Sequence, residues 1–326
     1  MSTKPDIRWG YAFNQWKQGW QGFARVEDHI RAFKATSAAG FHQIELTAFP
    51  GPWDPVGRPE SIAINFGSVR KFAMQLPDWG IDRVSSVFLD VGQLSFEDLH
   101  FGLLPTQRGQ HEAIFRQARL HAESIAEMGG ECLVVAPFPH FWKEGALNAE
   151  RMQAAADCWN AVGAMTKSLG LHTVLHLDAL SALRTTAELD QLLSLCDASC
   201  VNLAFDTAEL TIAGHDVVAL YRRYHERVRH FHFKDALAVD TLGEYQLPHA
   251  ERAMILAGGE RKIPRWFGEL GTGLVDFPGL LAAMNELGFN GLVIVESDKG
   301  PAPVMSSVLL NSWYLQHVLK VLPRPL

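Results

Sequence analysis

A regular alternation of two patterns runs along this chain of 326 residues and restricts its fold more than any other feature. Apolar runs rich in β-branched and aromatic residues recur eight times, and a segment with helical periodicity follows each of them. The runs are almost continuously apolar, which is typical of parallel strands covered by helices. We therefore predict an α/β protein in which eight parallel strands alternate with eight helices to form a (β/α)₈ barrel.

The expected elements can be placed from the ends of these runs. The predicted strands are 7–13, 42–47, 83–89, 132–136, 172–177, 201–205, 228–235 and 291–295, and the predicted helices lie near 26–39, 67–79, 107–128, 149–169, 186–196, 216–226, 277–287 and 302–319. An open, doubly wound sheet is the alternative, but no glycine-rich phosphate turn follows the first strand. Neither a linker nor an internal repeat divides the chain, so we predict one domain over residues 1–326, a TIM barrel.

Composition and charge exclude several classes of function. The chain is 48% hydrophobic and 20% charged, as is ordinary for globular proteins, and its net charge is −7. Without a basic run, this charge disfavours a nucleic-acid partner. No signal-peptide pattern and no apolar run of about 18 residues is present, so we expect no membrane partner. Four cysteines without a C-x-x-C pair are consistent with the reducing cytoplasm, where we place the protein.

The seventh predicted strand carries the strongest indication of chemistry. Its sequence V-R-H-F-H-F-K-D places His230, His232 and Lys234 on one face, because alternate residues of a strand face the same side. Burying such groups costs several kcal/mol unless each finds a partner. In a (β/α)₈ barrel the carboxyl ends of the strands gather at one mouth. We therefore expect the partners to come from the ends of strands five, six and eight.

Those three strands end in groups that can bind a metal ion. Strand five offers His176 and Asp178, strand six Asp206, and strand eight Glu296. Three carboxylates and one imidazole suit Mn²⁺ best, with Mg²⁺, Co²⁺ or Fe²⁺ as alternatives, rather than a structural zinc ion. Structural roles are the competing interpretations: Asp206 capping the next helix, His232 as a core histidine, and Glu296 in an ion pair with Lys234. Convergence at four strand ends favours the metal site.

Four segments resemble the xylose-isomerase-like barrel superfamily, and within it the inosose dehydratase and sugar-phosphate isomerase/epimerase branch. They are A-F-D-T-A-E-L-T-I-A-G-H-D, R-H-F-H-F-K-D, E-L-G-T-G-L-V-D-F and G-F-N-G-L-V-I-V-E-S-D. The resemblance implies one divalent metal, held by acidic residues of strands five, six and eight and by a histidine of strand seven. Asp206, His232 and Glu296 match the ligand positions of this family.

The chain departs from the family pattern at two places. The usual glutamate of strand five is replaced in V-L-H-L-D, where Asp178 is our preferred ligand because it lies further toward the barrel mouth. His176 is then the first candidate for the base. Glu209 occupies the position of a usual histidine in the sixth-strand motif, which argues against a multi-zinc nuclease site.

The resulting hypothesis is proton abstraction beside the carbonyl of a keto-carbohydrate, with a metal-stabilised enediolate. His176 is the preferred base, His140 and Glu45 are the others, and Lys234 is the expected donor to the oxyanion. A lyase reaction, by a dehydratase or a deglycosidase, is the preferred outcome, and a sugar isomerase or epimerase is the alternative. A non-catalytic sugar-binding barrel is the alternative of another class.

Aromatic residues in the loops favour a lyase that releases an aromatic aglycone. Six of them are placed where a flat group can stack: Trp53, Phe138, Phe141, Trp142, Trp266 and Phe267. Packing or loop anchoring is the structural alternative. C-glycoside deglycosidases, whose larger subunits are similar barrels, need a small partner subunit, so both this and a homo-oligomer stay open. Three arginines were considered for phosphate binding, although lone arginines are usually surface residues: Arg58, Arg184 and Arg265.

Overall fold

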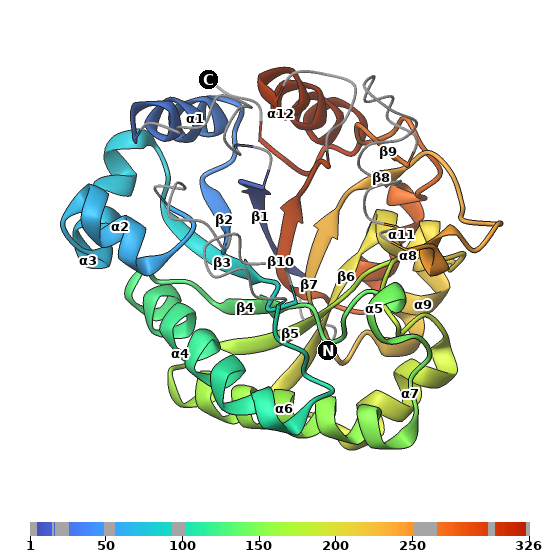
Figure 1. The fold of residues 1–326 in the computed structure, drawn as a ribbon. Coiled ribbons are helices and arrows are strands. Elements are labelled where there is room, and N and C mark those ends of the chain that lie inside the picture. The colour runs from blue at the N-terminus through green and yellow to red at the C-terminus, as the bar shows by residue number, and fades with distance from the viewer. Residues whose placement is uncertain are drawn as a thin grey trace.

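The computed structural model describes residues 5–14, 16, 26–48, 56–92, 102–248, 250, 266–298 and 304–323. Eight strands form a closed, fully parallel barrel in the order β1-β10-β7-β6-β5-β4-β3-β2. The view of Figure 1 looks into this barrel, with the strands at the centre and the helices around them. The first and last strands pair and close it, so the predicted (β/α)₈ barrel is confirmed.

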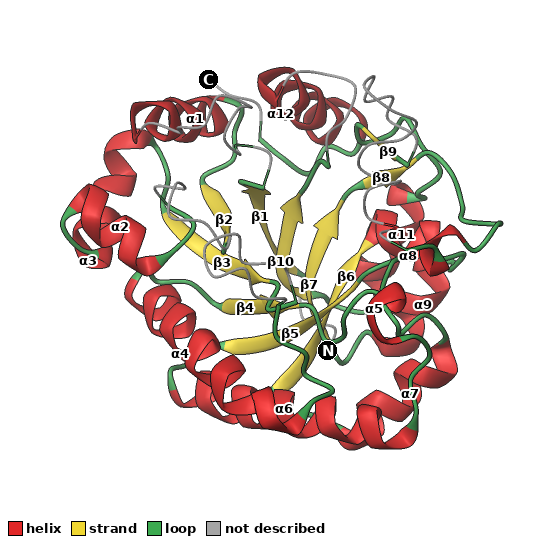
Figure 2. Ribbon diagram, viewed as in Figure 1, coloured by secondary structure: helices red, strands yellow, loops and turns green. Residues whose placement is uncertain are grey.

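Strand and helix bounds agree closely with the apolar runs, and Figure 2 shows their alternation. The barrel strands are β1 (Asp6–Ala12), β2 (Gln43–Thr47), β3 (Arg83–Leu89), β4 (Cys132–Val135), β5 (His172–Leu177), β6 (Val201–Asp206), β7 (Val228–Phe233) and β10 (Asn290–Val295). The helices are α1 (Val26–Ala38), α2 (Pro59–Phe66), α3 (Val69–Gln75), α4 (His111–Glu127), α5 (Phe141–Glu144), α6 (Ala149–Ser168), α7 (Thr186–Leu195), α8 (Thr207–Ile212), α9 (Val217–Tyr224), α11 (Phe277–Glu286) and α12 (Val304–Trp313).

Short elements at helix ends and over the barrel mouth were not predicted. Four single turns occur, η1 (Leu76–Trp79), η2 (Arg108–Gln110), η3 (Glu244–Gln246) and the π-turn η4 (Tyr314–Val318), and β8 (Asp235–Ala236) pairs antiparallel with β9 (Phe267–Gly268). The single helix expected at 67–79 begins instead as α2 and is interrupted at Gly67. This glycine has a φ of 88° and ends α2, and Ser68 caps α3 by accepting from the Lys71 amide.

Two apolar layers hold the site in place. Inside the barrel, small and branched side chains form one cluster, which consists of Ala12, Cys132, Val134, Val174, Ala204, Leu292 and Ile294. Outside it, the alternate residues Phe205, Phe231 and Phe233 pack toward the helices in the larger core. The inward-facing polar residues of β6 and β7 therefore have an apolar floor below them. Among the described residues, none of the helices is both long and apolar enough to cross a membrane.

Candidate metal centre at the barrel mouth

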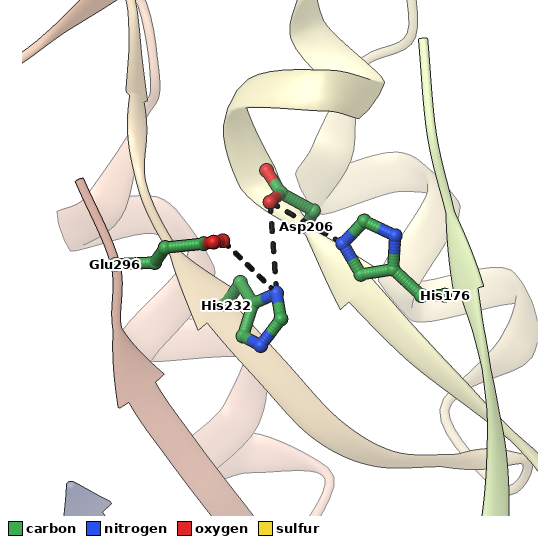
Figure 3. Close-up of side chains that lie close together, drawn as sticks. All are labelled: His176, Asp206, His232 and Glu296. Carbon is green, nitrogen blue, oxygen red and sulfur yellow. Dashed lines mark ion pairs between the residues drawn. The ribbon is translucent and has the colours of Figure 1, made fainter. Parts of the chain in front are cut away.

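Four side chains from adjacent strands point toward one another at the carboxyl end of the barrel (Figure 3). His176 comes from β5, Asp206 ends β6, His232 lies on β7 and Glu296 follows β10. Asp206 Oδ2 lies 3.4 Å from His176 Nε2 and 3.7 Å from His232 Nδ1. Glu296 Oε2 lies 3.1 Å from the same His232 nitrogen. The four facing atoms all lie within 4.8 Å of one another.

These four atoms share a chemical property that points to a cation. Each is buried and makes no hydrogen bond within the described residues, although the Lys234 ammonium forms ion pairs with the two carboxylate oxygens. Buried polar atoms without hydrogen bonds are costly inside a protein unless an ion or water satisfies them. Neighbouring ligands around a cation with bonds of about 2.1 Å lie about 3 Å apart, close to the observed separations. The residues therefore fit a divalent metal ion.

The second oxygen of each carboxylate is held elsewhere, which leaves one oxygen directed at the cluster. Asp206 Oδ1 caps α8 by accepting from the amides of Ala208 and Glu209, both at 2.9 Å. Glu296 Oε1 accepts from Asn14 Nδ2 at 2.8 Å. The structural interpretation of Asp206 as a helix cap is thus correct for one oxygen, while Oδ2 faces the proposed ion. Capping fixes the carboxylate and so orients the free oxygen.

Glu45 fixes the orientation of the His232 ring. Its Oε1 accepts from His232 Nε2 at 2.7 Å, and its Oε2 accepts from His230 Nε2 at 2.9 Å and from Ser86 Oγ at 2.7 Å. Because an ionised carboxylate can only accept, Nε2 carries a proton, and with a metal ion bound the imidazole would present the lone pair of Nδ1 to that ion. This carboxylate–imidazole arrangement is typical of metal-binding histidines. The geometry favours this orienting role over the role of base, since Glu45 is 1% exposed.

The charges around His232 favour a positive charge at Nδ1. Burial lowers the pKa of His232, but Glu45 and Glu296 outweigh burial and raise this pKa well above its usual value. Burial likewise raises the pKa of Glu45, yet the two imidazoles outweigh it and hold this pKa well below its usual range. Burial also raises the pKa of Asp206, but the Lys234 ammonium holds it well below its usual value. Without an ion, Nδ1 therefore holds a second proton beside ionised carboxylates, and a metal ion would take the place of that proton.

Lys234 lies beside the cluster and is 2% exposed. Its ammonium donates to Glu209 Oε1 at 3.0 Å and to Asp298 Oδ2 at 2.8 Å. It also forms ion pairs with Asp206 Oδ2 at 2.9 Å and Glu296 Oε2 at 3.4 Å. The ion pair with Glu296 that we considered from sequence is therefore present. Donation from Lys234 to a substrate oxyanion stays a prediction.

The structure does not bring Asp178, our preferred strand-five ligand, into the cluster, and His176 takes that place. β5 ends at Leu177, so Asp178 no longer follows the alternation of the strand. Its Oδ1 instead accepts from the Leu180 amide at 2.6 Å, and its Oδ2 lies 3.8 Å from His140 Nε2. His140 and Asp178 form a partly exposed pair at the mouth, with side chains 23% and 26% exposed.

The loop aromatics mostly serve packing. Phe138, Trp266 and Phe267 are buried, and the last two belong to a small apolar cluster with Ile212 and Ala236. Phe141 and Trp142 are half-buried, whereas Trp53 lies outside the described residues. Among the arginines, Arg184 donates to the Ala179 carbonyl and stacks over the Tyr245 ring at 3.7 Å. Arg58 precedes α2, and Arg265 lies outside the described residues.

Two residues of the site were missed by sequence reasoning. Asn14 bridges Glu296 and Asp298 through Nδ2, at 2.8 and 2.9 Å. Its position directly after the first predicted strand was the available signal. The ring of Phe88 lies 5.1 Å from that of His176 and 6.1 Å from that of His232, each in an edge-on arrangement. Phe88 is apolar, so reasoning from ionisable groups at strand ends does not identify it.

Comparisons with known proteins agree with this architecture. A family model described as the xylose isomerase-like TIM barrel matches residues 33–310. An inosose dehydratase from Lacticaseibacillus casei is 29% identical over 237 residues, which are 66% of this chain and 73% of that protein. The solved structure of a sugar phosphate isomerase/epimerase from Parabacteroides distasonis is 17% identical, with a TM-score of 0.65 over 98% of this chain and 96% of that one.

A second solved structure, the probable 3-DHS dehydratase from Bacillus anthracis, is 11% identical. Its TM-score is 0.68 over 95% of this chain and 99% of that one. At such identities the two structures support the fold alone. The predicted fold and the prediction that this chain is an enzyme are confirmed by the comparisons taken together.

Proposed function

The chain belongs to the xylose isomerase-like TIM barrel family, and from that premise we propose that it is a divalent-metal-dependent enzyme acting on a keto-carbohydrate. The reaction begins with removal of a proton from the carbon beside the carbonyl, and its preferred outcome is the loss of a β-substituent, as in a dehydratase. The observation that carries this proposal is the convergence of four buried ligand atoms from β5, β6, β7 and β10 within 4.8 Å of one another.

Two sets of residues would form the metal site: the ligands themselves and the residues that orient them. His176, Asp206, His232 and Glu296 would hold the ion. Glu45 fixes the tautomer of His232, and Asn14 fixes the orientation of Glu296. A bound divalent ion supplies Lewis acidity toward a carbonyl and a neighbouring hydroxyl.

The donor set refines the choice of metal. Two imidazoles and two carboxylates are softer than the three carboxylates and one imidazole expected from sequence. We therefore propose Mn²⁺, Fe²⁺ or Co²⁺, include Zn²⁺ in any trial, and expect Mg²⁺ to bind more weakly.

His140 is the base that we propose for the proton transfer. Because His176 belongs to the ligand cluster and Glu45 is buried behind His232, His140 is the sequence-derived candidate that remains accessible. Asp178, 3.8 Å from its Nε2, can hold the imidazole in place and stabilise its protonated form.

Loss of a β-substituent is favoured over isomerisation by the curated relative, which is named inosose dehydratase. A sugar isomerase or epimerase with the same first step is the alternative, and the structural relative from Parabacteroides carries such a name. A substrate with an aromatic aglycone is less well supported, because three of the aromatic residues predicted to stack on it are buried in the protein interior. A non-catalytic sugar-binding barrel is the alternative of another class.

Hydrogen–deuterium exchange tests the proposal independently of the final product. The Mn²⁺-loaded protein is incubated in D₂O with a keto-inositol, keto-sugars and 3-oxo-glycosides, and deuterium at the carbon beside the carbonyl is measured by NMR. We expect uptake that disappears with chelator and in Glu296→Gln. His140→Asn should keep its metal and lose about 10²–10⁴-fold in exchange rate.

Glu286→Gln is the matched control, because Glu286 lies in an exposed ion pair with Arg222. It should retain both metal and exchange. If the metal-loaded chain exchanges no proton in any of these compounds, proton abstraction is refuted. Binding of a sugar without exchange would support the non-catalytic alternative instead.

A further inference from the structure

Lys234 lies among four carboxylates and has the surroundings of a bound metal ion. Its Nζ is 2.8 Å from Asp298, 2.9 Å from Asp206, 3.0 Å from Glu209 and 3.4 Å from Glu296. The side chain is 2% exposed, and the Phe267 ring covers the ammonium at 4.6 Å. A single buried ammonium is thus the shared partner of four acidic groups.

Two of these oxygens are shared with the metal cluster. Asp206 Oδ2 and Glu296 Oε2, which contact Lys234, are the same atoms that face His232 Nδ1, at 3.7 and 3.1 Å. They therefore lie between the ammonium and the proposed ion. In two-metal sites, such shared carboxylates lie between ions about 3.5–4 Å apart.

We propose that Lys234 is a built-in second cation, which occupies the position of a second metal ion and restricts the centre to one. This inference rests on the metal site of the proposed function. Asp206, Glu209, Glu296 and Asp298 converge on the single ammonium of Lys234. Removing the lysine takes away this cation, and a further divalent ion can occupy its place.

The carboxylates around Lys234 are held independently of it. Glu209 Oε2 accepts from the Ala179 amide at 3.1 Å, and Asp298 Oδ1 accepts from Asn14 at 2.9 Å. Asp206 is fixed by the cap of α8. Truncating Lys234 therefore leaves a preformed acidic cage instead of freely moving side chains, and oxygen-rich cages of this kind bind Mn²⁺ and Mg²⁺.

Metal counting tests this directly, without any substrate. Metal-free full-length protein is titrated with Mn²⁺ by calorimetry, and the ions retained after desalting are counted by mass spectrometry. We expect one ion in the wild type and two in Lys234→Ala. Adding Asp298→Asn to that variant should weaken the second ion at least tenfold. Lys167→Ala is the control, because Lys167 contacts only the exposed Ser199 in the described structure, and it should bind one ion.

The outcomes distinguish failure of the proposed metal site from failure of the second-cation role of Lys234. A wild type that binds no ion refutes the metal site and this inference together. One ion in both the wild type and Lys234→Ala refutes the second-cation role alone, as does a wild type with two ions. If Lys234→Ala folds only when Mn²⁺ is supplied and then holds two ions, the inference is supported. If no Mn²⁺ concentration restores folding, a metal cannot replace the lysine and the inference is wrong.

Discussion

His121, on the buried face of α4, couples the stability of the chain to pH. Burial, with a smaller contribution from Arg58, lowers the pKa of His121 from 6.5 to about 4. The unfolded chain binds this proton at about pH 6.5, whereas the folded chain keeps the imidazole neutral down to about pH 4. The free energy of unfolding therefore falls as the pH drops from about 6.5 to about 4, by at most about 3 kcal/mol from this residue.

We expect His121→Gln to lower the number of protons taken up on unfolding by about one between pH 6.5 and 4.5. The unfolding free energy should then depend less steeply on pH. Urea unfolding of the metal-free protein across this range measures the slope. His317→Gln, at an exposed position after α12, is the control and should keep the slope of the wild type. If His121→Gln keeps that slope too, the imidazole is not the origin of the acid sensitivity.

At the same scale, the ligand of strand five shows where sequence reasoning reaches its limit. His176 and Asp178 are two residues apart, so alternation places both on one face and cannot choose between them. The choice depends on a local contact: the Leu180 amide donates to Asp178, which lies outside the cluster, whereas His176 lies within β5. Asp206, His232 and Glu296, by contrast, were predictable because they match the ligand positions of the family that the sequence resembles.

Among the elements, α6 contains Gly163 at a position where helix propensity alone would favour alanine. A Cβ at Gly163 would lie 2.8 Å from Val201 Cγ2 and 3.1 Å from the Cys200 carbonyl oxygen, where β6 begins. Alanine is favoured over glycine in a helix by about 1 kcal/mol. Overpacking against a strand costs about 1–3 kcal/mol. We expect the packing to dominate, so that Gly163→Ala destabilises the protein by about 1 kcal/mol in urea unfolding.

Gly109→Ala is the matched control, because nothing lies within 4 Å of the Cβ it would introduce. It should change stability by less than about 0.5 kcal/mol. Equal stability of both variants would mean that α6 moves away from β6 at little cost.

The elements that were missed share a physical cause. α8 has six residues and begins directly at Asp206 without an intervening loop, so no periodicity could reveal it. β8 and β9 have two residues each, and their pairing joins segments about 30 residues apart in the sequence. β3 and β5 were predicted at their observed bounds, because a glycine two or three residues before each strand and an aspartate directly after it mark both ends.

On the scale of the whole molecule, the two ends of the barrel have different tasks. At the amino end of the strands, Glu131 pairs with Arg8 and Arg83 at 2.8 and 2.7 Å, which ties β1 and β3 to the residue before β4. Asp6 also pairs with Arg8, so two acids face two arginines. At the carboxyl end, four carboxylates surround the single ammonium of Lys234. Conserving one end for stability and the other for chemistry is typical of such barrels, and here the difference lies in whether the charges are satisfied.

A metal at the mouth would therefore stabilise the closed barrel as a whole. Its ligands come from β5, β6, β7 and β10, four neighbours in the sheet, and the ion cannot find this arrangement in the unfolded chain. At a free Mn²⁺ concentration 100 times the Kd, the expected gain is about 2.7 kcal/mol. For a protein of this size that corresponds to a rise in Tm of about 5 °C. Thermal unfolding with Mn²⁺ and with chelator measures this difference, which should vanish in Asp206→Asn/Glu296→Gln and persist in the surface variant Glu286→Gln. A rise of the same size in the double variant would place the stabilising ion somewhere other than these four strands.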